Sequence, residues 1–220
     1  MAAVKKALLK VDFVSDISCP WCVVGLKSLE QALARLPNIN VDLHFEPFEI
    51  NPTMAKEGEE INEHLARKYG SSPTQLVQNR ERIRVRGEEL GFTFTLSAGG
   101  RIYNTFDAHR LIHWAGTKGP EAQHKLKMGL FTEYFTHGKD PSAESVLVDA
   151  AAAAGLDSEE ARSVLTSGQF ATDVKKAEAK WRSMNISGVP AVIINNKHLI
   201  SGGQPSEVFE QALRDIAAED

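Results

Sequence analysis

Two cysteines, Cys19 and Cys22, are the residues of this sequence best suited to covalent chemistry, and they are the only cysteines among its 220 residues. They are three positions apart, where a predicted strand is followed by a predicted helix. Side chains at this spacing on a first helical turn have Cβ atoms roughly 5–6 Å apart, and a small adjustment then permits a disulfide. The pair is therefore predicted to alternate between a dithiol and a disulfide.

The position of each cysteine predicts a different role. Cys19 is expected at the amino end of the helix, where unpaired backbone N–H groups and the helix dipole favour a thiolate. Cys22 is expected one turn further in, where it keeps its proton more readily. We therefore expect Cys19 to form mixed disulfides and Cys22 to resolve them. Asp12 and Glu46, on neighbouring predicted strands, are candidate acceptors for the Cys22 proton.

Two other interpretations of the cysteine pair are a structural role and one half of a metal site. A structural zinc site uses four ligands, and the sequence has no second pair of cysteines. His109 and His113 are four residues apart on a predicted helix, which would place both imidazoles on one face. They lack the glutamate of a metalloprotease motif, and a packed or solvated pair is the commoner case. We therefore predict redox chemistry and no metal.

The first 50 residues predict a β-α-β unit around the cysteines. Residues 8–15 form an apolar, β-branched run interrupted by Asp12, which is typical of a buried strand. Residues 23–36 carry valine and leucine at spacings of three and four and end at Pro37, which predicts an amphipathic helix. Residues 41–48 alternate apolar and polar side chains and predict a second strand. A right-handed crossover would make the two strands parallel.

Residues 59–184 predict a block of helices, in which only residues 92–96 look extended. The Ser72–Gln75 segment is a capping box with proline at the first helical position, and Asp157–Glu160 repeats the pattern. Gly155 predicts a helix end. Further helices are expected at residues 105–117, 121–136, 143–154 and 170–184.

Strand patterns return after residue 188. Residues 189–194 and 198–200 flank an Asn195-Asn196 turn and predict a hairpin, and residues 205–218 carry the apolar stripe of a terminal helix. Pro190 stands before the first of these strands, a position that an edge strand tolerates. Only about 5–6% of X-Pro bonds are cis. Position alone therefore leaves the isomer of the Val189–Pro190 bond open.

Composition excludes several classes of protein. The 42% hydrophobic and 25% charged fractions are those of an ordinary folded protein, and the length corresponds to about 1.5 domains. With 25 Lys and Arg against 29 Asp and Glu, the net charge of −4 has the wrong sign for a nucleic acid partner. No apolar run reaches the roughly 18 residues of a membrane span. The first ten residues lack the apolar core of a signal peptide, so we expect a cytoplasmic protein.

The sequence as a whole resembles the DsbA family, and within it the cytoplasmic FrnE-like branch. The resemblance rests on residues 13–22 with their Cys-Pro-Trp-Cys motif, on residues 104–113 and on residues 200–205. It implies an α/β, thioredoxin-like fold with an inserted all-helical domain. In this arrangement residues 1–55 and 170–220 form the discontinuous thioredoxin-like domain, and residues 56–169 form the insertion.

The same resemblance implies a substrate site around the cysteines. Pro190 would be the cis-proline that faces the disulfide, and Val189 would offer its backbone groups to an extended substrate. Pro20 and Trp21, between the cysteines, would tune the site and contact the substrate. His109 would line the groove beside the cysteines, because helical insertions of this family cover that face.

Three functions follow as alternatives. The first is a thiol–disulfide oxidoreductase or isomerase that requires no cofactor, acts on thiol- or disulfide-containing proteins, peptides or small molecules, and has glutathione as a candidate co-substrate. The second is a glutathione-dependent transferase or isomerase of a small aromatic substrate. Kappa-class glutathione transferases and 2-hydroxychromene-2-carboxylate isomerases share the layout, but they carry serine at the position of Cys19 and an acidic residue that residues 202–205 lack. The third is a peptide-binding holdase with idle cysteines. We expect the first, as a monomer or homodimer.

Overall fold

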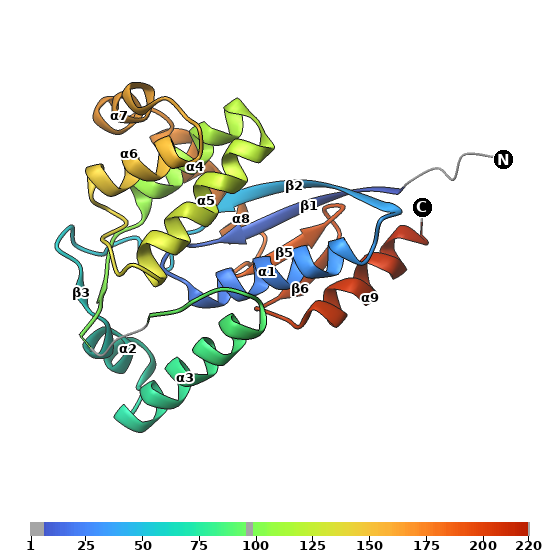
Figure 1. Ribbon diagram of the computed structural model, residues 1–220, viewed down its shortest axis with the longest axis horizontal. Helices are drawn as coiled ribbons and strands as arrows, with labels where there is room; N and C mark the ends of the chain where they lie inside the picture. The colour runs from blue at the N-terminus through green and yellow to red at the C-terminus, as the bar shows by residue number, and fades with distance from the viewer. Residues whose placement is uncertain (1–6, 96–98, 220) are drawn as a thin grey trace.

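A four-stranded mixed sheet forms the centre of the protein. The computed structural model describes residues 7–95 and 99–219, and the larger sheet has the order β2-β1-β5-β6 (Figure 1). β1 (Ala7–Ser15) runs parallel to β2 (Ile39–Pro47) and antiparallel to β5 (Ala191–Ile194), which pairs with the antiparallel β6 (His198–Ser201). The predicted β-α-β unit and hairpin are confirmed.

α1 (Pro20–Ala34) connects β1 to β2. Val23, Leu26 and Leu29 of this helix are completely buried and Leu33 is partly buried, and the helix ends shortly before Pro37. α9 (Ser206–Ala217) packs beside α1, and Figure 1 shows both helices in front of the sheet. These elements place the cysteines at the carboxyl end of the central strand.

β1 is buried on both faces. Leu9, Val11 and Phe13 belong to an apolar cluster shared with α1 and α9, whereas Val14 packs with Trp181 of α8 (Ala171–Ser183). Successive side chains of a strand point to opposite faces, so the two clusters lie on opposite sides of the sheet. Burial on both faces explains why β1 reads as an almost continuous apolar run.

Helices make up most of the chain between β2 and β5. Ser72 and Gln75 form the predicted capping box, and Asp157 accepts a hydrogen bond from the backbone N–H of Glu160 as predicted. α4 and α5 contact each other and β2, so they join this segment to the sheet. The helices here are α2 (Ile61–Tyr69), α3 (Pro73–Glu89), α4 (Phe106–Lys118), α5 (Pro120–Phe135), α6 (Glu144–Ala153) and α7 (Ser158–Ser167).

Two short strands differ from the expected all-helical character of residues 56–169. β3 (Glu59–Glu60) pairs with the antiparallel β4 (Arg101–Ile102), and strands of two residues are too short to leave a periodic pattern. The extended stretch expected at residues 92–96 forms no strand over residues 92–95, and Leu96 lies outside the described residues. Phe94 is instead buried against Phe135. The division into two domains stays a prediction.

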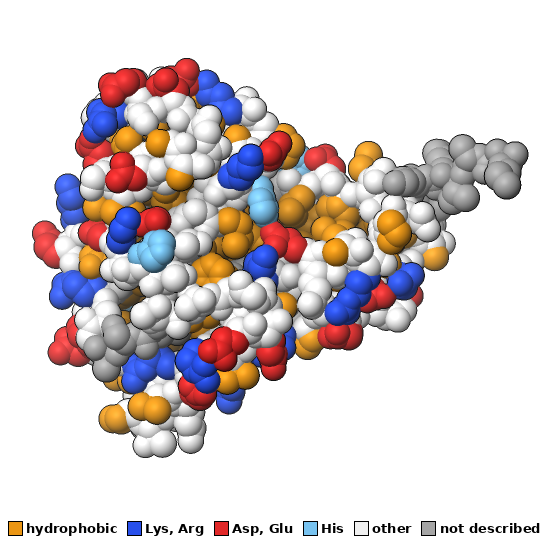
Figure 2. All heavy atoms as spheres, in the orientation of Figure 1, with side chains coloured by type: hydrophobic (Ala, Val, Ile, Leu, Met, Phe, Trp, Pro, Cys, Tyr) orange, Lys and Arg blue, Asp and Glu red, His pale blue; other side chains and the backbone are white. Residues whose placement is uncertain are grey.

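The surface mixes charges of both signs. On the face drawn in Figure 2, Lys and Arg side chains alternate with Asp and Glu side chains. On α3, Arg84 pairs with both Glu81 and Glu88, so the arginines of this helix are balanced by their own neighbours. Among the described residues, no helix is both long enough and apolar enough to cross a membrane.

Candidate active site

Cys19 and Cys22 lie at the junction of β1 and α1. Cys19 is the N-cap residue, with extended dihedrals of φ −100° and ψ 110°, and Pro20 is the first residue of the helix. The backbone N–H of Cys22 donates to the carbonyl oxygen of Cys19 at 3.0 Å, which closes the first turn. Both cysteines are free thiols, and they lie 3.5 Å apart. The pair is close enough to form a disulfide after a small adjustment.

The two thiols differ in their surroundings. Cys19 is 6% exposed, whereas Cys22 is completely buried. Burial raises the pKa of the Cys22 thiol well above its ordinary value of 9.0, and the neighbouring Cys19 raises it further. The charge of Lys127 and a hydrogen bond from the backbone of Asp16 lower the same pKa, but by less. Cys22 is therefore a protonated thiol at neutral pH, as its position in the helix predicts.

Val189 and Pro190 face the cysteines from the start of β5. The thiol of Cys19 donates to the carbonyl oxygen of Val189 at 3.6 Å, and the Val189–Pro190 peptide bond is cis, as the resemblance implies. Pro190 is buried against α1, where an added Cβ on Gly25 would lie 3.0 Å from its Cγ. This close approach brings the segment that precedes β5 directly over the first turns of α1.

Trp21 and Pro20 are half-buried between the two cysteines. The backbone of Gly203, in the loop before α9, lies against Trp21, and a Cβ on that glycine would be only 2.9 Å from the Trp21 carbonyl oxygen. The loop therefore has glycine where it passes the active-site turn. The predicted neighbours of the cysteines, Val189, Pro190, Trp21 and Pro20, all lie around this one turn.

Asp16, three residues before Cys19, organises the loop that leads to the cysteines. Its carboxylate accepts hydrogen bonds from the backbone N–H of Ile50 at 2.6 Å and from the Thr105 hydroxyl at 2.7 Å. The backbone N–H of Ser18 donates to it at 3.2 Å, and Nε2 of His109 lies 3.4 Å away. One buried carboxylate thus joins the ends of β1 and β2 to the start of α4.

These contacts keep Asp16 ionised. Its complete burial alone would raise the pKa of the carboxyl group, but the contact with His109 and the hydrogen bonds from Ile50 and Thr105 outweigh burial and lower it. The carbonyl oxygen of Asp16 also accepts from the backbone N–H of Cys19 at 3.2 Å. The backbone of Cys19 is thus held by Asp16, the same residue whose side chain fixes the loop.

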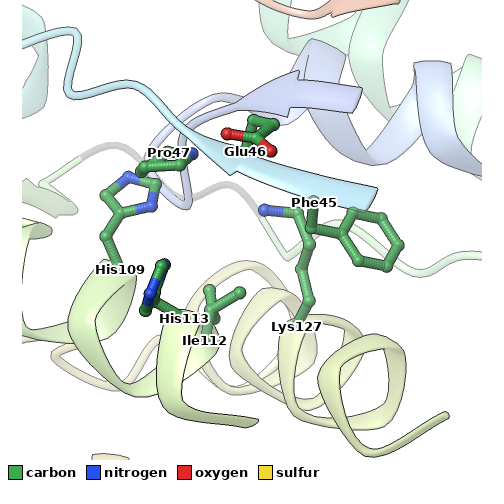
Figure 3. Close-up of a pocket in the computed structure, with 7 residues that line it drawn as sticks. All are labelled: Phe45, Glu46, Pro47, His109, Ile112, His113 and Lys127. Atoms are coloured by element: carbon green, nitrogen blue, oxygen red, sulfur yellow. The ribbon is translucent and has the colours of Figure 1, made fainter. Parts of the chain in front are cut away.

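His109 lies at a small cavity rather than on an exposed face, since it is only 2% exposed. Figure 3 shows His109 and His113 of α4 and Lys127 of α5 pointing toward β2, whose residues 45–47 form the opposite wall. His113 also packs against the ring of Phe170, with the ring centroids 5.3 Å apart. Whether His109 takes part in a substrate groove stays a prediction.

The carboxylates considered as proton acceptors are engaged elsewhere. Asp12 is buried and pairs with Lys10 at 2.8 Å through one carboxylate oxygen, whereas its other oxygen has no hydrogen-bond partner among the described residues. Glu46 accepts a hydrogen bond from Nε1 of Trp181 at 3.1 Å. The charge of Lys127, which is 1% exposed, lowers the pKa of Cys22, but by less than burial raises it.

Sequence reasoning missed four residues around the site. Asp16 and Thr105 look like ordinary loop residues, because their contact joins positions 89 residues apart. Lys127 does leave a signal, since Leu130, Phe131 and Tyr134 follow it at the spacing of one buried helix face. Tyr69, at the end of α2, is 60% exposed, and burial, followed by the charge of Cys19, raises the pKa of its hydroxyl.

Comparison with known proteins identifies the family. Residues 10–214 match the DSBA-like thioredoxin domain. The chain belongs to this family. A probable DsbA oxidoreductase from Streptomyces coelicolor is 31% identical and superposes with a TM-score of 0.90, over 96% of this chain and 91% of its own. The uncharacterized protein YwbO from Bacillus subtilis is 25% identical over 207 residues, which are 93% of this chain and 96% of YwbO.

Two more distant structures share the fold of this DsbA-like protein. A 2-hydroxychromene-2-carboxylate isomerase has 16% identity and a TM-score of 0.72, over 96% of this chain and 97% of its own. The cytosolic disulfide reductase DsbM from Pseudomonas aeruginosa, solved with GSH, has 15% identity and a TM-score of 0.62, over 95% of this chain and 99% of DsbM. The expected α/β, thioredoxin-like fold and the DsbA-family resemblance are thus confirmed, and the family is one of thiol–disulfide oxidoreductases.

Proposed function

We propose that this DsbA-like protein is a dithiol–disulfide oxidoreductase or isomerase that acts on proteins and peptides through Cys19 and Cys22. The observation that carries the proposal is the asymmetry of the pair. Cys19 caps the amino end of α1 and is 6% exposed, while Cys22 is completely buried, protonated and 3.5 Å away. One thiol is thus suited to attack and the other to wait until a mixed disulfide has formed.

The reaction follows from this asymmetry. The Cys19 thiolate attacks a substrate disulfide, forms a mixed disulfide and releases one substrate sulfur as a thiolate. Cys22 then loses its proton and attacks Sγ of Cys19, so that the Cys19–Cys22 disulfide forms and the second substrate sulfur leaves as a thiolate. The substrate gains two electrons and the enzyme loses two. The reverse sequence oxidises a substrate dithiol, and both sequences together rearrange disulfides.

The backbone beside the cis-proline supports an extended substrate. Val189 is half-buried next to Cys19, and Pro190 fixes its position over α1. A peptide that pairs with the backbone of Val189 would bring its sulfur to Cys19 without needing a particular sequence, because main-chain hydrogen bonds supply the contact. Trp21 and Pro20, half-buried in the same turn, supply apolar contacts to that peptide.

Insulin reduction and the reshuffling of a scrambled disulfide protein test this function. Cys19→Ser should abolish both activities, because no mixed disulfide can form. Cys22→Ser should instead accumulate a mixed disulfide with the substrate, visible by mass spectrometry, because the resolving thiol is missing. Cys19→Ser protein that keeps full activity would exclude the proposal.

A cavity near the site favours glutathione as a co-substrate that restores the dithiol. The cavity has a volume of 490 Å³, and its lining includes Lys68, Asn51 and the ion pair of Arg67 with Glu59. Lys68 donates to the carbonyl oxygen of Ile50, whose own N–H binds Asp16 beside the cysteines. Glutathione carries two carboxylates, and either one suits the ammonium group of Lys68. Calorimetric titration should show binding that Lys68→Met weakens at least about tenfold, and unchanged binding would rule out this cavity.

We place the reaction in the cytoplasm, in agreement with the structural likeness to a cytosolic disulfide reductase. In a reducing compartment the dithiol form is expected to dominate unless the potential of the pair is unusually low. Acid quenching of cells followed by alkylation should therefore recover Cys19 and Cys22 mainly as thiols. Recovery mainly as a disulfide would argue for an oxidising location.

A further inference from the structure

The outer edge of β2 has no neighbouring strand in the part of the chain that the structure describes. The order of the larger sheet is β2-β1-β5-β6, so β2 pairs with β1 alone. The helices that contact β2 are α4, α5 and α8, and Figure 1 shows them over its carboxyl half, while its amino half extends beyond them. The edge formed by residues 39–43 is therefore open to a partner.

Two hydrogen bonds show which residues of β2 turn their backbone to this free edge. Nε2 of Gln123 donates to the carbonyl oxygen of Phe45 at 3.4 Å, so Phe45 turns its backbone away from β1. On β1, the carbonyl oxygen of Lys10 accepts from the backbone N–H of Asn195 at 2.9 Å and thus faces β5, and the parallel register with β2 gives the same alternation. Backbone groups of alternate residues point to the same side of a strand, so the odd-numbered residues of β2 face the free edge.

The backbone groups of Ile39, Val41 and Leu43 therefore point to the free edge. The N–H of Ile39 donates to the carbonyl oxygen of Leu36 at 3.0 Å, in the turn before the strand, and is not available to a partner. The carbonyl oxygen of Ile39 and both backbone groups of Val41 and Leu43 remain directed outward. A row of such groups is a template for pairing with a further strand.

The side chains along this edge separate into an apolar and a polar face. Ile39, Val41 and Leu43 are half-buried and pack against the core cluster that includes α1. Figure 2 shows hydrophobic side chains gathered over β2 between α5 and α1. Asn40 and Asp42 are exposed on the opposite face. A strand that pairs here would gain main-chain hydrogen bonds and apolar contacts on one face together with polar contacts on the other.

The order of residues in the strand suits a second copy of itself in antiparallel orientation. With a twofold axis through Val41, the N–H of Val41 in each copy meets the Val41 carbonyl oxygen of the other, and the N–H of Leu43 meets the carbonyl oxygen of Ile39. The apolar side chains of Ile39 and Leu43 then lie opposite each other. The same axis places Asn40 opposite Asp42, so that an amide donates to a carboxylate.

The neighbouring registers are less favourable. An axis through Asp42 would place two carboxylates opposite each other, where like charges repel. An axis through Asn40 would pair Leu43 with Pro37, which has no N–H to donate. The register through Val41 avoids both losses.

We propose that the free edge of β2, residues 39–43, binds a second copy of this chain, and that the two four-stranded sheets join into one continuous sheet. The cysteines follow the carboxyl end of β1, which is parallel to β2. Because the two copies of β2 are antiparallel, the two cysteine pairs lie at opposite ends of the homodimer and away from the interface. This inference goes beyond the proposed function and does not depend on it.

Sedimentation equilibrium of the full chain, over a range of about 1 to 200 μM, tests the proposal. The unaltered protein should show a monomer–dimer equilibrium. Asn40→Asp should raise the dimer Kd at least about tenfold, because the axis places each new carboxylate opposite Asp42 of the other copy. Asn40→Asp combined with Asp42→Asn should return the Kd toward that of the unaltered protein, because the exchange restores an amide opposite each carboxylate.

Two further variants separate this edge from the rest of the surface. Ser201→Asp is the matched control, because it adds the same charge at an exposed position of β6, the other edge strand, and it should leave the Kd unchanged. Val41→Pro removes an N–H that points to the free edge and not to β1, so it should raise the Kd at least about tenfold. If Val41→Pro does not fold, the exchange of Asn40 and Asp42 gives the answer by itself.

Three outcomes would overturn the proposal. They are a monomer over the whole concentration range, a dimer whose Kd is the same with and without Asn40→Asp, and a dimer that Ser201→Asp weakens instead. The result is separable from that of the proposed function, because sedimentation requires no substrate. A dimer of this kind that fails to reduce insulin would refute the oxidoreductase and retain the interface, and an active monomer would refute the interface and retain the oxidoreductase.

Discussion

Replacing Lys127 by methionine should make the protein more stable, by an amount that depends on pH. Lys127 is completely buried, and burial lowers its pKa from the ordinary 10.5 to about 8. A lysine of lowered pKa destabilises the fold wherever it must carry a charge, by about 1.4 kcal/mol for each pH unit of the difference. Below about pH 8 this amounts to about 3 kcal/mol, which Lys127→Met removes. Methionine also fits the apolar surroundings and the length of the lysine stem.

The sign of the pH dependence follows from the protons bound in each state. Between about pH 8 and 10.5 the unfolded chain keeps Lys127 protonated, while the folded protein has released that proton. The stability of the unaltered protein therefore rises with pH across this window. The methionine variant lacks this rise. Its advantage is complete below about pH 8 and disappears near pH 10.5.

Urea unfolding measures the difference in free energy of unfolding between the methionine variant and the unaltered protein. The oxidised protein is used because its disulfide prevents both thiols from ionising. Asp16 is then the remaining charge that favours the protonated lysine. Free energies of unfolding at about pH 7 and pH 10.5 give the two values required. Lys125→Met, at an exposed position, should change stability by less than about 0.5 kcal/mol at both. A Lys127→Met protein that is less stable than the unaltered one at pH 7, or whose advantage is the same at both pH values, would refute the reasoning.

Three further changes test other parts of the structure. Asp16→Asn should lower the free energy of unfolding by about 2–3 kcal/mol in urea titrations at neutral pH, because the ionised carboxylate accepts three hydrogen bonds. The low pKa of Asp16 implies that this loss shrinks as the pH falls below 3.8, and a loss independent of pH would contradict that account. The free energy of unfolding of the unaltered protein should decline as the pH rises from about 4.5 to 7, because burial raises the pKa of Glu49 to about 7 and the folded state keeps a proton that the unfolded chain releases. Glu49→Gln should remove this decline, and equal declines in both proteins would disprove the explanation. Gly203→Ala should lower the free energy of unfolding by roughly 1–3 kcal/mol and lower Tm, because the added Cβ would lie 2.9 Å from the Trp21 carbonyl oxygen. Gly129→Ala is the control, because this glycine lies on a helix with open space around it, and it should not lower Tm.

The parts of the fold that sequence predicts are those specified by neighbouring residues. The apolar run of β1, the periodicity of α1 and the paired asparagines before β6 each act within a few residues, and all three elements appear close to the expected boundaries. Asn195 and Asn196 both have positive φ angles, of 51° and 55°, which suits the tight hairpin turn predicted for them. The placement of the cysteines follows from the same local rules.

The parts that sequence does not predict depend on contacts between distant segments. Nothing near Asp16 indicates that Thr105 and His109 complete its environment, because that contact forms only when α4 docks on the sheet. The pairing of β3 with β4 likewise depends on the chain path rather than on a pattern within either strand. Lys127 is an intermediate case. Its helical spacing places it on the buried face of α5, but only the structure shows that its ammonium group lies over the rings of Phe45 and Phe131.

The strand order β2-β1-β5-β6 also affects the protein while it is being synthesised. The ribosome delivers β1, α1 and β2 first, yet the central strand β1 receives its second neighbour only when β5 emerges near the carboxyl end. Until then Cys19 lacks its contact with the Val189 carbonyl, and the complete burial of Cys22 belongs to the finished fold. A nascent chain that ends before β5 therefore has both thiols but lacks Val189 and Pro190, which face them in the complete fold. Selective exchange begins only when the last strands have joined the sheet, so premature termination would leave an unselective dithiol rather than a weakened enzyme.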